Sequence, residues 1–302
     1  MVSSERRGTI LGVAAYVMWG LFPIYWPLLE PGGALEVLAH RVVWSLVFVV
    51  ALVLVVGRRA RDIPYDARSM RLLCAAAVLI GINWGVFIWA VNNDHVLEGS
   101  LGYFINPLVT VALGVMVLGE RLRVLQWSAV AVAAIGVTIL AVETGRPPWV
   151  ALVLAVTFGT YGLVKRIVGV GALQGLVVEA AVLAPVALGY LIWLGISGDS
   201  TFTGHGPDHV ALLISSGPVT AVPLLLFAGA AARVPLSQLG VLFYLNPTMQ
   251  FLIGVFVKHE PLSAGRGVGF ALVWVALIVF TADSLTNNRR RQIALTAEAS
   301  AA

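Results

Sequence analysis

Long apolar stretches follow one another along almost the whole chain, separated by short polar or charged joints. Each stretch has about 18 to 24 residues, which is enough for a helix to cross a hydrocarbon layer of roughly 30 Å. The pattern therefore predicts an all-α integral membrane protein with ten transmembrane helices. We expect these at about 9–28, 34–56, 70–92, 99–118, 125–142, 148–168, 174–196, 207–228, 235–257 and 263–282.

Composition agrees with this pattern and excludes several classes of protein. The 302 residues are 59% hydrophobic and 11% charged, whereas a soluble domain carries roughly 25% charged residues. The single cysteine, Cys74, excludes an internal disulfide and a cysteine metal cluster. We find no phosphate-binding loop, zinc-protease or serine-hydrolase motif. The sequence therefore predicts no ATP-hydrolysing site, no other catalytic site, no metal and no cofactor.

The basic residues predict how the chain crosses the membrane. With the N-terminus in the cytoplasm, fifteen of the 19 Lys and Arg residues fall on the inner side, and Arg41 lies inside a span. This excess predicts cytoplasmic termini in a bacterial-type plasma membrane, and it explains the net charge of +4 without a nucleic-acid partner. Residues 285–302 lack apolar periodicity, and we expect a disordered cytoplasmic tail there.

Two segments 140 residues apart repeat each other. Tyr103–Pro107 aligns with Phe243–Pro247, and in the same register Glu120 meets Glu260. A weaker similarity at a shift of 142 aligns residues 16–21 with 158–163, so that Tyr16 aligns with Phe158 and Trp19 with Tyr161. The chain thus divides into related halves, 1–145 and 146–284.

Five spans in each half place the second half in the opposite orientation, which makes an inverted repeat. Such repeats belong mostly to transporters, because two inverted copies can exchange conformations and expose a central site to each side in turn. The alternative is a duplication that built a stable bundle, as in some channels.

Polar residues inside spans are costly, and this makes them candidates for function. Glu36, His40 and Trp44 share one face of the second span, with Arg41 beside them. His40, Asn83 and Asn106 would lie about 10 Å below the outer surface and would line one vestibule. Alternatively Arg41 snorkels or pairs with Glu36 or a backbone carbonyl, and His40 is a packing residue.

Proline in each Asn-Pro pair frees the carbonyl four residues earlier, at Tyr103 and Phe243. The pair therefore predicts either a polar cavity lining near Asn106 and Asn246 or a kink that serves packing alone. Trp19 would form an aromatic wall or would simply pack. Glu179 is the best carboxylate for a coupling proton, unless it caps its helix or pairs with Lys165.

Several segments resemble one known family: 13–23, 38–45, 83–84, 101–108, 120–122, 126–127, 217–220 and 223–224. Among them the segments Ala39-His-Arg41 and Gly102-Tyr-Phe-Ile-Asn-Pro107 are the most specific. Together they resemble the RarD branch of the EamA-type transporters, within the drug/metabolite transporter superfamily. The resemblance implies ten helices in inverted five-helix repeats around a central cavity, and secondary transport of metabolites or amphenicol-like drugs.

The combined hypothesis is a gradient-driven transporter of small organic solutes whose partners are its substrate, membrane lipids and a coupling proton. It would act as a monomer or weak homodimer. A passive channel or facilitator and a membrane-embedded enzyme are the alternatives. The candidate substrate or translocation residues are Trp19, His40, Arg41, Asn83, Tyr103, Asn106, Glu179, Tyr244 and Asn246.

Overall fold

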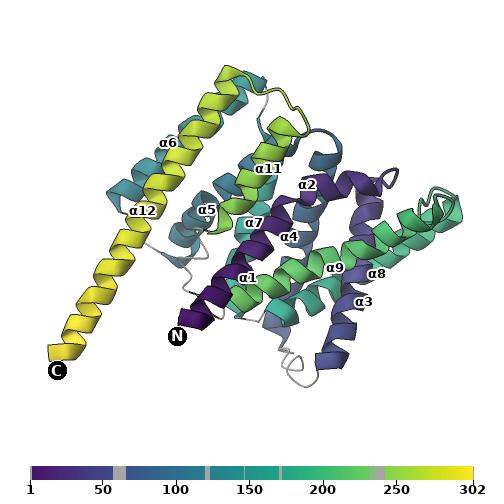
Figure 1. Ribbon diagram of the computed structural model, residues 1–302, viewed down its shortest axis with the longest axis horizontal. Coiled ribbons are helices and arrows are strands. Elements are labelled where there is room, and N and C mark those ends of the chain that lie inside the picture. The colour runs from purple at the N-terminus through teal and green to yellow at the C-terminus, as the bar shows by residue number, and fades with distance from the viewer. Residues whose placement is uncertain are drawn as a thin grey trace. The chain divides into compact units, whose positions relative to one another are not determined.

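The computed structural model describes residues 2–56, 66–119, 123–145, 147–169, 172–231, 233–234 and 242–301, and the regular elements in these ranges are helices (Figure 1). Their bounds are α1 Val2–Gly20, α2 Phe22–Tyr25, η1 Trp26–Leu29, α3 Ala34–Val56, α4 Ala67–Asn92, α5 Val96–Leu118, α6 Val124–Thr144, α7 Trp149–Val168, α8 Ala172–Ser197, α9 Gly206–Ala231, α11 Leu245–Phe256 and α12 Ala264–Ala301.

Eight stretches of helix among the described residues are long and apolar enough to cross a membrane, which makes the chain an all-α, multi-pass membrane protein. They correspond to the predicted spans one to five, seven, eight and ten. The predicted sixth span is the shorter apolar helix α7, and the predicted ninth is represented by α11 because residues 235–241 lie outside the described residues. The count of ten spans stays a prediction.

The first predicted span is not one continuous helix. α1 ends at Gly20, and the chain continues as α2 and the 3-10 helix η1. Pro23 and Pro27 are the second residues of these two short elements. Proline lacks the N–H that would extend the preceding helix, so the chain re-initiates at each proline.

α12 extends as a helix through Ala301 and so covers most residues of the expected tail. The disorder of residues 285–302 stays a prediction. Arg, Gln, Ala, Leu and Glu, which dominate residues 289–298, are all good helix formers. This intrinsic preference offsets the missing apolar periodicity.

The described chain forms two compact units, each made of segments distant in sequence. The first comprises Met1–Asn106 and Val150–Glu260, and the second Pro107–Trp149 and Pro261–Ala302. Each sequence half is therefore shared between both units. The division at residue 145 describes the repeat and stays a prediction.

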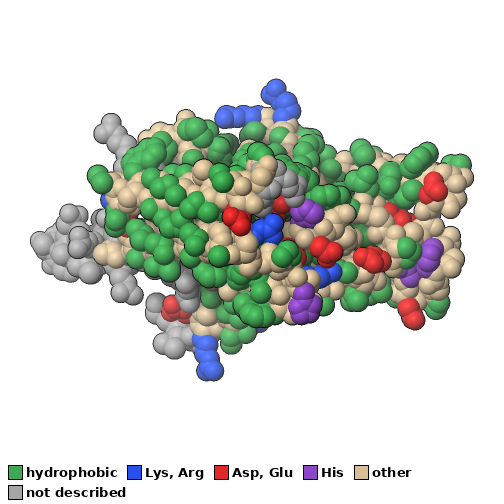
Figure 2. Space-filling view, turned by 90° about the horizontal axis from the view of Figure 1, so that it is seen from above, with side chains coloured by type: hydrophobic (Ala, Val, Ile, Leu, Met, Phe, Trp, Pro, Cys, Tyr) green, Lys and Arg blue, Asp and Glu red, His purple; other side chains and the backbone are tan. Residues whose placement is uncertain are grey.

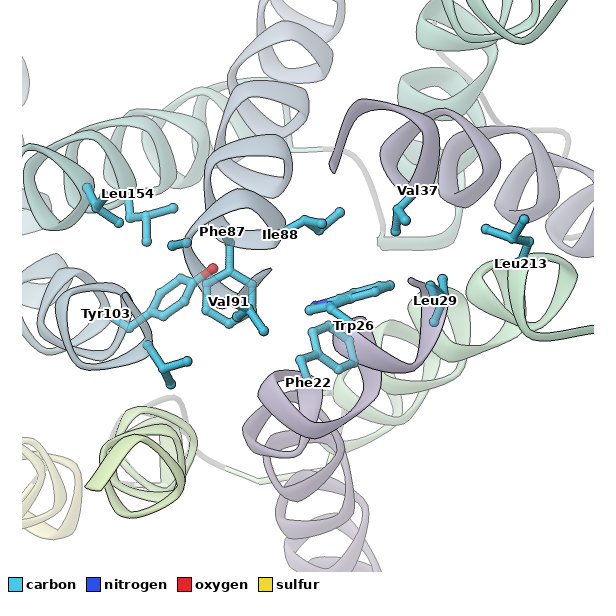
Figure 3. Close-up of a cluster of buried hydrophobic side chains, with 13 residues drawn as sticks. Phe22, Trp26, Leu29, Val37, Phe87, Ile88, Val91, Tyr103, Leu154 and Leu213 are labelled. Atoms are coloured by element: carbon cyan, nitrogen blue, oxygen red, sulfur yellow. The ribbon is translucent and has the colours of Figure 1, made fainter. Parts of the chain in front are cut away.

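The core of the first unit brings α2 and η1 against α4. Phe22, Trp26 and Leu29 lie beside Phe87 and Val91 in one buried cluster (Figure 3). Lipid tails are as apolar as these side chains, so close van der Waals packing rather than water exclusion stabilises this cluster. Accordingly Trp26 and Leu29 are completely buried.

Glycine allows α3 and α9 to approach very closely. A β-carbon on Gly217 would lie 2.3 Å from the backbone carbonyl carbon of Trp44. The Ser45 hydroxyl donates a hydrogen bond to the Gly217 carbonyl at 3.4 Å across the same crossing. Small residues give membrane helices this kind of backbone contact.

The second unit contains the helix pair α6 and α12. Gly136 and Gly269 face each other there, since a β-carbon on either would lie within 3.0 Å of the other's carbonyl oxygen. An ion pair of 2.5 Å joins Arg123 to Asp283. Large apolar side chains such as Ile135 are exposed on these helices, and hydrophobic side chains cover much of the face seen in Figure 2, as expected for a lipid-facing surface.

Candidate functional site

Arg41 of α3 is buried inside the first unit with its guanidinium among aromatic rings. Its central carbon lies 4.0 Å from the ring centroid of Trp84, 4.9 Å from Trp26 and 5.6 Å from Phe22. Only 3% of the residue is exposed. Aromatic faces attract cations through their quadrupoles, so these rings stabilise the charge in part.

The polar contacts of Arg41 are few. Its Nε donates a 2.7 Å hydrogen bond to Thr220 Oγ1, which in turn donates to the Ser216 carbonyl. Among the described residues no carboxylate lies within ion-pair distance of Arg41. The alternative in which Arg41 pairs with Glu36 is therefore not found in the described chain.

Glu36 is engaged by the segment before α9 instead. Its carboxylate accepts hydrogen bonds from the Thr201 backbone N–H at 2.7 Å, from the Thr201 hydroxyl and from the Ser200 hydroxyl. The Thr201 hydroxyl is also 3.0 Å from Nε2 of His209. This network fastens the start of α3 to the loop between α8 and α9.

His40 is buried beside the same loop. Its ring stacks on Phe202 with 4.9 Å between centroids, and Trp44 Nε1 donates to its Nδ1 at 3.3 Å. The other ring nitrogen, Nε2, is buried without a hydrogen-bond partner among the described residues. The surroundings of His40 are thus mainly those of a packing residue, with one buried polar atom left over.

Asn83 and Tyr103, two predicted site residues, bind each other. The Tyr103 hydroxyl donates to Asn83 Oδ1 at 3.2 Å. Asn83 Nδ2 donates to the Leu154 carbonyl and to Thr157 Oγ1, both at 3.0 Å. Asn83 therefore joins α4, α5 and α7, and its side chain is occupied by protein partners.

Six aromatic rings from α1, α5, α7 and the segment before α11 meet in the first unit. Tyr16 contacts Phe243 edge-on, with 5.8 Å between centroids and an interplanar angle of 83°. Phe158 contacts Tyr103 in the same way, at 6.0 Å and 90°. Trp19 lies 5.5 Å from Tyr16, and Tyr161 lies 5.9 Å from Phe158. We call Tyr16, Trp19, Tyr103, Phe158, Tyr161 and Phe243 the ring cluster.

The two Asn-Pro pairs occupy different positions in their helices. Pro107 lies inside α5, but Pro247 is the third residue of α11, which begins after a turn at Tyr244. Because first-turn N–H groups need no helical partner, Pro247 sits there without breaking a bond. Interruption of the predicted ninth span at this point is the structural consequence of that proline.

Asn106 and Asn246 are both buried. Asn246 Oδ1 accepts a 2.8 Å hydrogen bond from Gln250, whose other amide atom, Oε1, is buried without a partner among the described residues. Tyr244 is half-buried with its ring 6.2 Å from Phe243. A vestibule shared by His40, Asn83 and Asn106 stays a prediction.

Glu179 of α8 is buried and paired. Lys165 Nζ of α7 donates to its Oε1 at 2.8 Å, and the Tyr161 hydroxyl donates to its Oε2 at 3.1 Å. The pairing with Lys165 that the sequence left open is therefore present. Through Tyr161 this ion pair adjoins the ring cluster.

Sequence reasoning missed several groups that complete these contacts. Trp26, Trp84 and Thr220 surround Arg41 from three other elements, and Thr201 holds Glu36 from more than 160 residues away. No spacing within one helix signals such partners. Gln250 was not missed, because the sequence pattern places it on one helical face with Phe243 and Asn246.

Comparison with known proteins gives consistent results. Residues 6–142 match the EamA-like transporter family. The chain is 52% identical over 300 residues to Protein RarD of Streptomyces exfoliatus, covering 98% of this chain and 95% of that protein. It is 45% identical to the uncharacterized transporter YojE of Bacillus subtilis (92% and 95% covered) and 43% identical to Protein RarD of Escherichia coli (94% and 97% covered). One crystal structure at 17% identity and TM-score 0.60 covers 92% of this chain and 98% of its own, and shows a common fold.

Proposed function

The chain belongs to the RarD branch of the EamA-like transporter family, and we propose that it is a secondary-active transporter of small organic solutes with two inverted five-helix halves. It would work by alternating access in a bacterial plasma membrane, with both termini in the cytoplasm. Bacterial relatives named as uncharacterized transporters support this assignment over a membrane enzyme. The wider distribution of Lys and Arg supports the orientation.

One observation carries the proposal: the ring cluster contains the same contact twice. Tyr16 aligns with Phe158, and Phe243 aligns with Tyr103, in the internal repeat. The edge-on contact of Tyr16 with Phe243 at 5.8 Å therefore has its counterpart in that of Phe158 with Tyr103 at 6.0 Å. Each contact joins a residue of one sequence half to a residue of the other.

Such a pair suits alternating access for an energetic reason. Two equivalent contacts between inverted halves can be broken one at a time, and the two resulting states have similar energies. We propose that the Tyr16 contact closes one side of the transport path and the Phe158 contact closes the other. The remaining rings, Trp19 and Tyr161, would form the wall that meets the solute.

Matched substitutions test this mechanism without knowledge of the substrate. In a Cys74→Ala background, spin labels on Asp94→Cys and Asp199→Cys report one distance between exposed positions by double electron–electron resonance. Tyr16→Ala and Phe158→Ala each remove one of the equivalent contacts. An aromatic pair is worth about 0.5–1.5 kcal/mol, so each substitution should shift the ratio of the two states roughly 2- to 12-fold.

The direction of the shift decides the outcome. We expect two distance populations, with Tyr16→Ala enriching one and Phe158→Ala enriching the other. Leu46→Ala, which changes a residue packed against a separate cluster around Ala39 and Val42, should leave their ratio unchanged. A single population, or equal shifts in the same direction, would contradict alternating access through these contacts.

A further inference from the structure

We propose that Arg41 and Trp26 form an anion-binding subsite and that the transported solute is a small organic carboxylate with an apolar body. This inference rests on the proposed transport function and names its substrate class. The subsite comprises Arg41, Trp26, Trp84, Phe22 and Thr220, all in the first unit.

Among the residues that the structure describes, no carboxylate pairs with the charge of Arg41. A guanidinium has five N–H donors, and among the described residues Arg41 makes one hydrogen bond, from Nε to Thr220. Its two terminal nitrogens thus have no protein acceptor in the described chain. Burying an ion without a partner is strongly unfavourable, so a ligand of opposite charge would be bound with a large gain.

The carboxylate nearest to Arg41 in the sequence is hydrogen-bonded to other residues. Glu36, the acidic residue closest in sequence on α3, accepts three hydrogen bonds from Ser200 and Thr201. The hydroxyl that Arg41 binds, that of Thr220, donates its own proton to the Ser216 carbonyl. The protein therefore presents donors here, with no acidic acceptor for them among the described residues.

Trp26 supplies a second, independent donor. Its ring lies 4.9 Å from the Arg41 guanidinium carbon, the residue is completely buried, and its Nε1 has no hydrogen-bond partner among the described residues. A buried indole N–H normally finds an acceptor. An oxyanion beside Arg41 would supply one, since the cation and the indole share the same surroundings.

The geometry favours a carboxylate over a spherical anion. The Trp84 ring is 4.0 Å from the guanidinium carbon, and guanidinium groups stack on aromatic faces while their edges bind carboxylates through two parallel hydrogen bonds. Phe22, Trp26 and Trp84 would then contact the rest of the solute. Figure 3 shows Phe22 and Trp26 side by side within the apolar cluster that would receive it.

Pairs of ligands that match in size but differ in charge test the substrate class on the purified full chain in detergent. Thermal unfolding is measured at equal ionic strength with acetate and acetamide, butyrate and butyramide, and benzoate and benzamide, and with chloride as a spherical anion. A ligand that binds only the folded state raises the unfolding midpoint as its concentration rises. We expect benzoate to stabilise most, acetate least, and each amide at least about tenfold less by apparent affinity, because it lacks the charge.

Substitutions then locate the site. Arg41→Gln should weaken benzoate at least about tenfold, and Trp26→Phe, which keeps a ring but removes the N–H, should weaken it several-fold. Arg41→Lys should rescue only part of the affinity, because lysine cannot form the paired fork. Arg71→Gln, which removes an exposed arginine at the start of α4, should bind benzoate like the unmodified protein.

Several results would overturn the proposal. Equal stabilisation by benzoate and benzamide would exclude recognition of charge, and equal stabilisation by chloride and benzoate would exclude a carboxylate substrate. Unchanged benzoate binding in Trp26→Phe and Arg41→Lys would exclude this location, even if Arg41→Gln fails to fold. None of these outcomes alters the spin-label ratio, so the alternating-access proposal is judged separately.

Discussion

Lys165 and Glu179 form an ion pair between α7 and α8, with 2.8 Å between Nζ and Oε1. The ammonium occupies the space that a side chain at position 175 would need, because a β-carbon on Gly175 would lie 1.6 Å from Nζ. Glycine at this position is what lets lysine reach the buried carboxylate.

Gly175→Ala should therefore separate Lys165 from Glu179. Breaking a buried pair costs roughly 3–5 kcal/mol, but the lysine side chain is flexible and 16% exposed, so we expect a loss of about 2 kcal/mol. A lowered unfolding midpoint in detergent would show it. Gly162→Ala is the matched control on α7, since nothing lies within 4 Å of its added β-carbon; equal midpoints for the two variants would refute the explanation.

Asn83 should prove to be a positioning residue for Tyr103. Asn83→Leu keeps the approximate volume but leaves the Tyr103 hydroxyl and the Leu154 carbonyl without their partner, at a cost of about 1–3 kcal/mol. In a double-mutant cycle with Tyr103→Phe, the two changes should be less than additive by about 1 kcal/mol. Strict additivity of the unfolding free energies would mean that the hydrogen bond contributes nothing.

Close contact between α3 and α9 should make Gly217 intolerant of any side chain. The added β-carbon of Gly217→Ala would meet the Trp44 backbone, which cannot move as a flexible side chain does. Overpacking costs typically 1–3 kcal/mol, and a backbone clash belongs at or above the upper end of that range. Gly189→Ala on α8 is the control, because the added atom has open space around it, and this variant should unfold at the same temperature as the unmodified protein. If Gly217→Ala protein is monodisperse and equally stable, the close contact between α3 and α9 is contradicted.

Glu260 gives stability a defined dependence on pH. Its carboxylate, in the loop after α11, accepts hydrogen bonds from the backbone N–H groups of Val96 at 2.6 Å and Leu97 at 3.1 Å. Burial nevertheless raises its pKa above the ordinary value of about 4.5. The folded state thus holds the Glu260 proton more tightly than the unfolded state does. The stability that this difference adds is fully present below pH 4.5 and is lost as the pH rises through the raised pKa.

Thermal unfolding measured between about pH 4 and 8 checks this dependence. Glu260→Gln cannot ionise, so the downward step in its unfolding midpoint above pH 4.5 should be smaller than that of the unmodified protein. Glu5→Gln, which removes an exposed carboxylate at the start of α1, should retain the full step. If Glu260→Gln and the unmodified protein follow parallel curves, another group governs the pH dependence.

Apolar length alone located most helices because it depends on local composition. The predicted span 34–56 coincides with α3. By contrast α5 begins at Val96 rather than at residue 99, because Glu260 satisfies the N–H groups of its first turn from about 160 residues away. Such a cap cannot be recognised from the sequence around the helix start.

The candidate site was predictable in kind but less so in its contacts. Arg41 and Glu179 stood out because charges inside spans are rare. Their partners, Trp84 and Thr220 for Arg41 and Lys165 for Glu179, lie on other helices. Asn83 was expected to line a vestibule together with His40 and Asn106, yet its amide is held by Leu154, Thr157 and Tyr103.

The pairing of α6 with α12 bears on how the protein is made. α6 ends at Thr144, and its partner α12 begins only at Ala264. A ribosome adds about 5–20 residues per second, so α12 begins to be made roughly 6–24 s after α6 is complete. Until then the Gly136 surface of α6 meets lipid in place of Gly269. A chain cut short before α12 would expose this surface permanently, and membrane quality-control proteases would have a recognisable sign of incomplete synthesis.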